Sequence, residues 1–445
     1  MEKVTVRAAS SLRGAVTVPG DKSISHRALI LSSQARGESR ISGLSQGEDV
    51  RDTARALRAL GVPSGRWGDE PYTLSGMGPG GWKEPSDVLD FGNSGTGVRL
   101  MAGMLAAHPF FSVLSGDRYL RRRPMRRIVD PLKLMGASIE GRQKGNFLPL
   151  AVAGGELQGI SCRTPVASAQ IKSAIILAGL LGRGTTEVTE PAPSRDHTER
   201  MLRYLGVELE EEGRTVRLRG GQEWEAKDIL VPGDPSSAAF LLAAALVIPG
   251  SEVTVRGVCV NGTRTGFFDI LGEMGADISF AGRREVCGEP VADITARSCS
   301  LKGVSVPPSL VPRAIDEFPI LAAIALFAEG ETVISGAEEL RVKESDRIRT
   351  MASELGRIGG RVKEREDGLV IAGGDRLTTA SCGSHGDHRV AMALAVAGCA
   401  VRGGLTVEDT TCVKTSFPTF WQTLEGLGGK VEHGRSVPDG RDGQA

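Results

Sequence analysis

Small polar and cationic side chains gather in this chain where apolar helices are expected to begin, a pattern typical of anion binding. Residues 18–27 read Val-Pro-Gly-Asp-Lys-Ser-Ile-Ser-His-Arg, and the apolar residues 28–31 follow directly. The small polar residues are candidate N-caps, so Lys22, Ser23 and Arg27 are expected in or beside the first turn of a helix. Free backbone N–H groups and the helix dipole attract anions there, and two cations strengthen that attraction. The stretch therefore predicts an anion-binding site.

A glycine-rich turn at residues 91–99, Phe-Gly-Asn-Ser-Gly-Thr-Gly-Val-Arg, is a second place where backbone N–H groups can contact an anion. Asn93 and Gly95 lie at its centre. The turn does not fit the dinucleotide-binding pattern, and residues 20–23 lack the glycine directly before lysine that a phosphate-binding loop requires. Each stretch taken alone is equally compatible with a simple helix-capping turn.

Arginines and hydrogen-bonding side chains recur further along the first half of the chain. Six arginines lie between residues 118 and 127, and Pro124 is expected at the first position of the next helix, with Arg123 at its mouth. An arginine there can clamp a carboxylate or phosphate, although a solvated charged face is the ordinary alternative. Residues 168–170, Ser-Ala-Gln, and Arg195 stand at helix starts, where they can bind hydroxyls or phosphate oxygens or act as plain caps.

The second half supplies carboxylates as well as cations. Asp316 precedes the apolar run 320–327, where a carboxylate is unfavourable unless it is paired or used, so it is a candidate general base. Lys343 and Arg347 are four residues apart and are expected to share one face of a helix, with Glu344 on a neighbouring face. For Glu344 the alternative is a surface ion pair worth roughly 0.3–0.5 kcal/mol. Asp387-His388-Arg389 and Lys414 follow, and His388 has a plain capping or core role as its alternative.

Composition excludes several classes of protein. A chain of 445 residues suggests two or three domains, and its 54 Lys and Arg balance its 54 Asp and Glu, so no global basic field would recruit nucleic acid or a membrane. The seven cysteines are odd in number and scattered, which fits neither a disulfide framework nor a zinc site and indicates a reducing compartment. The N-terminus lacks an apolar signal core, and the apolar runs are too short to cross a bilayer, so we expect a cytoplasmic protein.

Two interleaved series of helices repeat along the chain. Capped apolar helices are expected near residues 21, 93, 167, 235, 316 and 387, and amphipathic helices ending in Leu-Gly or Met-Gly alternate with them. This predicts an α/β fold of six βαβ-type units, divided into two lobes of three units whose helix N-termini face a common cleft. The motif Val-Pro-Gly-Asp occurs at 18–21 and again at 231–234, where the chain is expected to cross between lobes. Lobe one is then 20–231, and lobe two is 1–19 with 232–445, of which 434–445 is expected to be disordered.

These motifs together resemble the family of 3-phosphoshikimate 1-carboxyvinyltransferase, also called 5-enolpyruvylshikimate-3-phosphate (EPSP) synthase. The resemblance covers about residues 12–430 and rests on VPGDKSISHR, FGNSGTG, RRP, RVKESDR and DHR. It implies two lobes that close like a clamp, and transfer of the enolpyruvyl group of phosphoenolpyruvate to the 5-hydroxyl of shikimate 3-phosphate with release of phosphate. It also implies that no metal or organic cofactor takes part, that these two small molecules are the only partners, and that the protein is a monomer.

The resemblance assigns a role to each matching residue. Shikimate 3-phosphate is expected to contact Lys22, Ser23, Arg27, Ser168, Ala169, Gln170, Arg195, Asp316 and Lys343. Phosphoenolpyruvate is expected to contact Lys22, Asn93, Gly95, Arg123, Gln170, Arg347, Arg389 and Lys414. Asp316 would take the proton of the 5-hydroxyl, and Glu344, with Lys22 sharing the role, would protonate the methylene carbon of phosphoenolpyruvate.

Three rival functions stay open at this point, and one of them, a non-catalytic anion-binding relative, is disfavoured because Lys22, Asp316 and Glu344 are all present. UDP-N-acetylglucosamine 1-carboxyvinyltransferase has the same architecture, but residues 115–122 lack the reactive cysteine of that family. An RNA-end-processing or RNA-binding protein is disfavoured by zero net charge and sparse aromatic residues.

Features of the sequence also point to a subtype of the family. Glu339 and Ala169 stand where the better-known branch has Asn and Ser, and segments 169–172, 195–199 and 261–264 resemble the second class, which is often tolerant of glyphosate. Gly95 points the other way, because it leaves space for that inhibitor.

Overall fold

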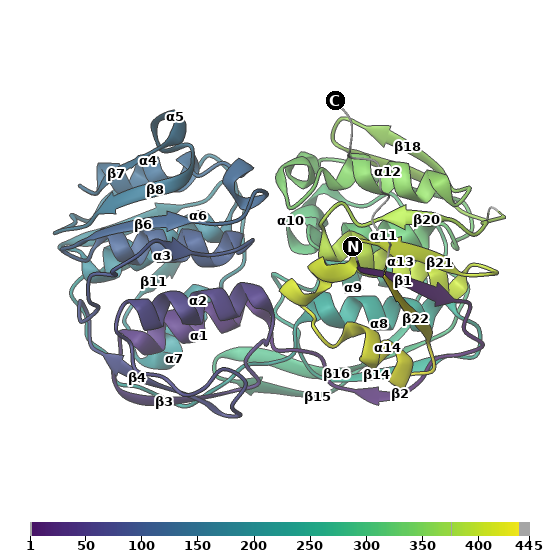
Figure 1. The fold of residues 1–445 in the computed structure, drawn as a ribbon, viewed down its shortest axis with the longest axis horizontal. Helices are drawn as coiled ribbons and strands as arrows, with labels where there is room; N and C mark the ends of the chain where they lie inside the picture. Colours follow the sequence, from purple (N-terminus) through teal and green to yellow (C-terminus); the bar gives the residue numbers. More distant parts are fainter. Residues whose placement is uncertain (1, 375, 436–445) are drawn as a thin grey trace, which may run out of the picture.

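Two lobes of mixed α/β structure lie side by side in the computed structural model, which describes residues 2–374 and 376–435 (Figure 1). The left lobe in the figure is built from the purple, blue and first teal parts of the chain, and the right lobe from the later teal, green and yellow parts together with the two N-terminal strands. Within the described residues, six small sheets of three or four strands cover the helices, and no helix there is long and apolar enough to span a membrane.

The left lobe contains most of the first half of the chain. Its helices are α1 (Lys22–Ser33), α2 (Glu48–Ala59), α3 (Gly95–Ala106), η1 (Leu120–Arg122), α4 (Arg126–Leu134), α5 (Arg142–Gly145), α6 (Ala169–Leu181) and α7 (His197–Leu205). Its strands are β3 (Arg36–Ser42), β4 (Tyr72–Met77), β5 (Leu89–Asp90), β6 (Phe111–Ser115), β7 (Ser138–Gly141), β8 (Phe147–Ala153), β9 (Ser161–Arg163), β10 (Thr185–Thr189), β11 (Glu210–Glu212), β12 (Thr215–Arg219) and β13 (Ile229–Leu230). They form sheets of order β13-β3-β4, β5-β6-β8-β7 and β11-β12-β10-β9.

The right lobe combines the chain start with the second half. Its helices are α8 (Pro235–Val247), α9 (Gly266–Glu273), η2 (Pro308–Leu310), α10 (Val311–Ala314), α11 (Phe318–Ala325), η3 (Glu338–Val342), α12 (Arg347–Arg357), α13 (His388–Ala400), η4 (Thr410–Thr415) and α14 (Phe420–Gly426). Its strands are β1 (Glu2–Arg7), β2 (Arg13–Val16), β14 (Glu252–Cys259), β15 (Asp277–Val286), β16 (Glu289–Arg297), β17 (Glu331–Ile334), β18 (Arg361–Arg365), β19 (Gly368–Ala372), β20 (Ser381–Gly383), β21 (Leu405–Glu408) and β22 (Lys430–Arg435). They form sheets of order β15-β16-β14-β2, β17-β19-β18 and β20-β21-β1-β22.

The two expected helix series are present in the structure. Helices α1, α3, α6, α8, α11 and α13 are almost completely buried, as apolar helices in a protein core must be, and they separate into two hydrophobic cores. The amphipathic helices α2, α4, α7, α9, α12 and α14 are each followed by a glycine with positive φ, which only glycine adopts without strain. Those glycines are Gly61, Gly136, Gly206, Gly275, Gly359 and Gly428. The repeated helical pattern read from the sequence is therefore confirmed.

Two predicted helix starts are wrong. Helix α4 begins at Arg126 with Met125 as its N-cap, so Pro124 is outside the helix instead of at its first position. Helix α12 begins at Arg347, because the side chain of Asp346 caps it by accepting a hydrogen bond from the backbone N–H of Arg349 at 3.1 Å. Lys343 has an extended backbone after η3, so it shares no helix face with Arg347.

The chain passes between the lobes at two turns that are bonded to each other. The backbone N–H of Asp21 donates to the carbonyl of Pro232 at 2.8 Å, and that of Asp234 donates to the carbonyl of Pro19 at 2.9 Å. Strand β2, before the first turn, pairs with β14, whereas β13, before the second turn, pairs with β3. The hairpin of β15 and β16 extends from the right lobe beneath the left one (Figure 1). The prediction of a disordered tail is wrong for residues 434 and 435, which belong to β22 and pair with β1, and residues 436–445 lie outside the described residues.

Candidate active site between the lobes

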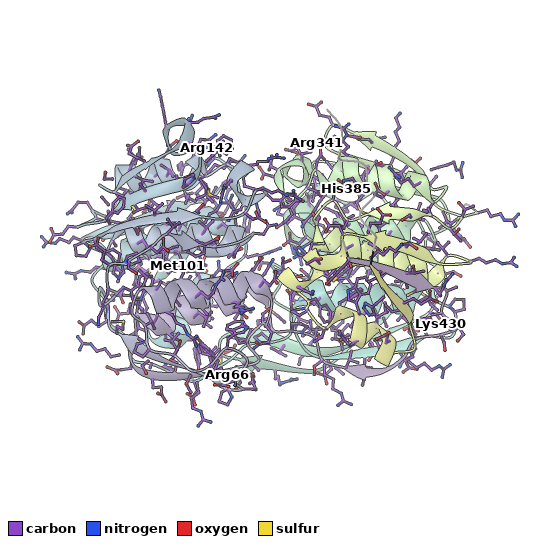
Figure 2. The ribbon with its side chains drawn as sticks, in the orientation of Figure 1. Arg66, Met101, Arg142, Arg341, His385 and Lys430 are labelled. Atoms are coloured by element: carbon purple, nitrogen blue, oxygen red, sulfur yellow. The ribbon has the colours of Figure 1, made fainter. Side chains whose placement is uncertain are left out.

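A cavity of about 430 Å³ opens between the lobes, within the size range of small-molecule sites, about 300–1,000 Å³. Side chains of both lobes project into the space between the two ribbons (Figure 2). Twelve of the residues predicted from the sequence line this cavity: Lys22, Ser23, Gly95, Arg123, Ser168, Ala169, Gln170, Arg195, Asp316, Lys343, Glu344 and Arg389.

Helix N-termini bring the first-lobe residues to the cavity. Asp21 caps α1 by accepting from the N–H of Ile24 at 2.9 Å, and Lys22 is the first residue of that helix. The Nζ of Lys22 lies 2.8 Å from Oδ2 of Asp49, a buried carboxylate on α2. Since the positive end of α1 and the ammonium point to the same place, this corner of the cavity attracts anions.

Gly95 is the first residue of α3, and its lack of a side chain decides where Arg123 can lie. A Cβ at position 95 would fall 2.6 Å from Nη1 of Arg123 and 2.7 Å from its Cζ. Real Cβ atoms do not approach other atoms this closely, so any larger residue would displace the guanidinium. Glycine here allows an arginine to rest against the N-terminus of a helix, where the two together can bind an anion.

Gln170 joins the starts of α3 and α6. Its Oε1 accepts from Nη1 of Arg99 at 2.7 Å, and its Nε2 donates to Oγ1 of Thr96 at 2.9 Å. The buried Arg99 also donates to the carbonyls of Gly95 and Pro124. Arg99 therefore holds the loop that carries Arg123 against the start of α3. Sequence analysis missed Arg99 and Thr96, although both belong to the glycine-rich stretch, because one chain shows no contacts between units.

The two predicted catalytic carboxylates are held by arginines from the opposite lobe. Arg195 donates to Oδ2 of Asp316 at 2.6 Å, and Arg123 donates to Oε1 of Glu344 at 3.3 Å. Arg389 adds a second contact to Asp316, from Nη2 to Oδ2 at 3.6 Å. The cations and the carboxylates are therefore interleaved across one cleft instead of forming two separate patches.

Electrostatics keep both carboxylates ionised. Burial by itself raises the pKa of Asp316, but Arg389 and Arg195 outweigh it, so the pKa lies well below its usual value. The pKa of Glu344 is likewise raised by burial and lowered further by Arg347 and Arg123, with a net result well below normal. An anionic ligand that neutralises these arginines would let the pKa of both carboxyls rise, which makes their proton affinity dependent on occupancy of the site.

Four predicted site residues do not line the cavity. Arg27 is buried and donates to Oγ1 of Thr198 at 2.6 Å, and Arg347 is buried behind Glu344, where its Nε donates to Asp387 at 2.8 Å. Asn93 is partly exposed and lies outside the lining, within the turn before α3. Lys414 is exposed, 3.2 Å from Glu2, at a separate cavity of about 350 Å³.

His388 is a buried residue at the start of α13. Burial lowers the pKa of His388 to about 3, so this histidine is neutral at physiological pH. Among the described residues there is no cluster of three His, Cys, Asp or Glu side chains that could hold a metal ion, and all seven cysteines are free thiols.

Several known proteins to which this chain is similar carry the name of one enzyme. The sequence profile of the family described as EPSP synthase (3-phosphoshikimate 1-carboxyvinyltransferase) matches residues 6–424. A 3-phosphoshikimate 1-carboxyvinyltransferase of Geobacter metallireducens is 54% identical over 96% of this chain and 99% of its own length. One from Gloeobacter violaceus is 53% identical over 94% of this chain and 98% of its own length.

The fold of this chain is similar to that of solved structures. An EPSP synthase from Acinetobacter baumannii superimposes with a TM-score of 0.88 at 43% identity and covers 98% of this chain and 100% of its own. The enolpyruvyl transferase NikO from Streptomyces tendae superimposes with a TM-score of 0.76 at 18% identity, covering 98% of this chain and 99% of its own, which indicates a shared fold alone.

Proposed function

The chain belongs to the EPSP synthase family, and from that premise we propose that its interlobe cavity transfers the enolpyruvyl group of phosphoenolpyruvate to the 5-hydroxyl of shikimate 3-phosphate, with release of phosphate. The protein is thus a transferase of the shikimate pathway, which leads to the aromatic amino acids. One observation carries the proposal: cations of both lobes surround two carboxylates in one cavity. Each substrate has a carboxylate and a phosphate of about −1.5 to −2, so a site for both must hold roughly five negative charges.

Shikimate 3-phosphate is assigned mainly to the first lobe. Ser168 stands directly before α6 without capping it through its side chain, which favours contact of its hydroxyl with phosphate. The backbone of Ala169, the amide of Gln170 and the guanidinium of Arg195 complete the anion site, together with the N-terminus of α1 at Lys22 and Ser23. Asp316 and Lys343 would contact the ring hydroxyls from the second lobe. Arg27 acts through Ser23, whose backbone carbonyl accepts from Arg27 at 2.8 Å.

Phosphoenolpyruvate is assigned to the space between α3 and the second lobe. The N–H groups at Gly95 and the guanidinium groups of Arg123 and Arg389 would hold its phosphate and carboxylate, with Lys22 and Gln170 at the edge. Arg347 does not line the cavity. Its Nη2 lies 2.6 Å from Oε2 of Glu344, so it acts on the bound phosphoenolpyruvate through that carboxylate. Asn93 and Lys414 would take part only after movement of the glycine-rich turn or of η4.

Three proton transfers, made by two proton carriers, define the chemistry. Glu344, with Lys22 sharing the role, protonates the methylene carbon of phosphoenolpyruvate, which leaves C2 cationic. Asp316 takes the proton of the 5-hydroxyl. The hydroxyl oxygen of shikimate 3-phosphate then attacks C2, which gives a tetrahedral intermediate. The carboxylate of Glu344 then takes one proton back from the new methyl group, and the departure of phosphate restores the enol ether. Each proton carrier is worth about 10²- to 10⁴-fold in rate.

We further propose that residues 20–231 form one lobe, that 1–19 with 232–445 form the other, and that the lobes close as a monomer around the substrates. The two bonded turns at 18–21 and 231–234 support a hinge at this place. Seven free thiols fit a reducing compartment such as the cytoplasm.

We also propose that the chain belongs to the second, often glyphosate-tolerant class. Glu339, in place of Asn, pairs across the cleft with Arg127 at 2.8 Å, and Ala169 in place of Ser fits the same assignment. Gly95 weighs against tolerance, so the inhibition curve is the deciding measurement.

A phosphate-release assay tests the main proposal. The purified protein is incubated with phosphoenolpyruvate and shikimate 3-phosphate, with each substrate alone, and with UDP-N-acetylglucosamine in place of shikimate 3-phosphate. Phosphate should appear only with the first pair. Release with UDP-N-acetylglucosamine would favour the rival transferase, and no release in any mixture would reject enolpyruvyl transfer.

A further inference from the structure

A buried arginine lies between the two turns at which the chain crosses from lobe to lobe. Arg264, in the turn between β14 and α9, is only 3% exposed. Its Nη2 donates to Oδ1 of Asp234 at 3.1 Å and to Oγ of Ser236 at 2.8 Å, and its Nη1 forms an ion pair with Oδ2 of Asp21 at 3.4 Å. One guanidinium therefore contacts residues on both sides of the double crossing.

The two aspartates that Arg264 contacts each cap the N-terminus of a helix. Asp21 caps α1, and Asp234 caps α8 by accepting from the N–H of Ser236 at 2.8 Å. Each aspartate also ends one crossing turn, and its backbone N–H is bonded to the other turn. Because Lys22 follows Asp21 directly, a shift of the first cap moves Lys22 with it.

The same cluster extends to the residue next to Asp316. Ser236 donates a short hydrogen bond from its hydroxyl to Oε1 of Glu317, and Arg264 lies 4.0 Å from that oxygen. Glu317 is buried, and its Oε2 has no hydrogen-bond partner among the described residues. Burial raises the pKa of Glu317, and Arg264 opposes that rise. Arg264 is thus the central cation of a group of three buried carboxylates.

The turn that carries Arg264 also contacts the first lobe at a second place. Asn261 donates through Nδ2 to Oδ1 of Asp196 at 2.6 Å and to Oε2 of Glu289 at 2.9 Å. Asp196 directly follows Arg195, which holds Asp316 across the cleft. The turn therefore contacts the neighbours of both members of the ion pair between Arg195 and Asp316: Asp196 through Asn261, and Glu317 through Arg264.

We propose that Arg264 is a positioning residue that fixes the first lobe's Lys22 relative to the second lobe's Asp316, by holding the caps of α1 and α8 together. This rests on the proposed function, in which these two residues act on the same pair of substrates. Without Arg264 three buried carboxylates lose their common counter-charge, and the least costly response is separation of the two turns. The reacting groups would then no longer converge, whereas the shikimate 3-phosphate contacts within the first lobe would remain.

The test compares Arg264→Met, Arg264→Lys and the core variant Ile139→Ala, which changes a buried residue of β7 far from the crossing. Turnover and KM for each substrate are measured together with amide hydrogen exchange of Asp21 and Asp234 in the whole protein. For Arg264→Met we expect kcat to fall by roughly 100-fold, since a misplacement of about 1 Å can have that effect, with a much smaller change in the KM for shikimate 3-phosphate. Exchange at both aspartates should accelerate, and Arg264→Lys should restore part of both properties.

Ile139→Ala should lower the unfolding temperature without accelerating exchange at the two turns and without this loss of kcat. The proposal is overturned if Arg264→Met retains wild-type kcat, if kcat and KM change in proportion, or if exchange at Asp21 and Asp234 stays at the wild-type rate. If Arg264→Met does not fold, Arg264→Lys decides alone by the same two measurements. Failure of the proposed function is seen separately, as a wild-type protein with no turnover, and the exchange measurement does not depend on it.

Discussion

Arg195 of the first lobe donates a hydrogen bond of 2.6 Å to the carboxylate of Asp316 in the second lobe. The proposed base is therefore held by a proposed ligand of shikimate 3-phosphate. A phosphate that binds Arg195 competes with Asp316 for the guanidinium and weakens the interaction that lowers the pKa of this carboxyl. Substrate binding would thus make Asp316 a stronger base at the moment when a 5-hydroxyl is beside it.

Replacing Asp316 by alanine separates catalysis from binding. In Asp316→Ala, kcat should fall by roughly 10²- to 10⁴-fold, the usual contribution of a general base, while the dissociation constant of shikimate 3-phosphate changes far less. Steady-state kinetics and calorimetry measure the two quantities. Asp316→Asn is the control, because it preserves the shape of the side chain and an oxygen for Arg195. Equal losses in turnover and affinity would reject the role of base.

Lys22 is expected to bind both substrates. Hydrogen bonds to charged groups contribute about 1.5–3 kcal/mol, so Lys22→Ala should weaken phosphoenolpyruvate and shikimate 3-phosphate by roughly tenfold or more each. Lys22→Arg retains the charge beside Asp49, which lies 2.8 Å from Nζ, and should recover part of the affinity. Calorimetric titration with each ligand is the measurement, and unchanged affinity in Lys22→Ala would exclude a binding role.

The contact between Gly95 and Arg123 predicts a selective defect. A methyl group at position 95 would lie 2.6 Å from Nη1 of Arg123, so Gly95→Ala should displace the guanidinium and raise the KM for phosphoenolpyruvate more than that for shikimate 3-phosphate. Gly272→Ala is the matched control, since a Cβ at position 272 meets no atom within 4 Å. Glyphosate inhibition curves on the same proteins test the subtype. Equal sensitivity of wild type and Gly95→Ala would remove Gly95 from the explanation of tolerance.

The sequence predicts most of the fold because its signals are local. Caps such as Asp21, C-terminal glycines such as Gly206 and apolar runs such as 238–247 depend on a few neighbouring residues, and they occur in the structure where expected. Lys343 shows where such local signals fail. Its spacing of four residues from Arg347 predicted a shared helix face, but the side chain of Asp346 caps α12, so the helix begins after Lys343.

Contacts between units could not be predicted from one chain. The family resemblance assigns Lys414 to phosphoenolpyruvate, yet this lysine pairs with Glu2, 412 positions away. The partners of Arg264 are also distant in the sequence, at positions 21, 234 and 317. Such contacts depend on how the two lobes are placed, and no local pattern encodes that placement.

A buried carboxyl behind the glycine-rich turn predicts an unusual dependence of stability on pH. Asp52, on α2, is 7% exposed, and its carboxylate lies against Gly92. Burial raises the pKa of Asp52 from 3.8 to about 7, with Arg55 opposing the rise and Asp49 adding to it. Since the folded protein binds this proton more tightly than the unfolded chain, the contribution of Asp52 to stability is complete below about pH 4 and is lost as the pH rises through about 7.

Asp52→Asn removes the titration while preserving the shape of the side chain. At pH 8 we expect the variant to unfold at a higher denaturant concentration than wild type, with a gain of about 1–3 kcal/mol, since one pKa unit corresponds to about 1.4 kcal/mol. The gain should disappear near pH 4, where Asp52 is protonated in both states and the asparagine offers no advantage. Urea unfolding of both proteins across this range is the measurement. A difference that does not vary with pH would mean that Asp52 is ionised throughout and is stabilised by Arg55 instead.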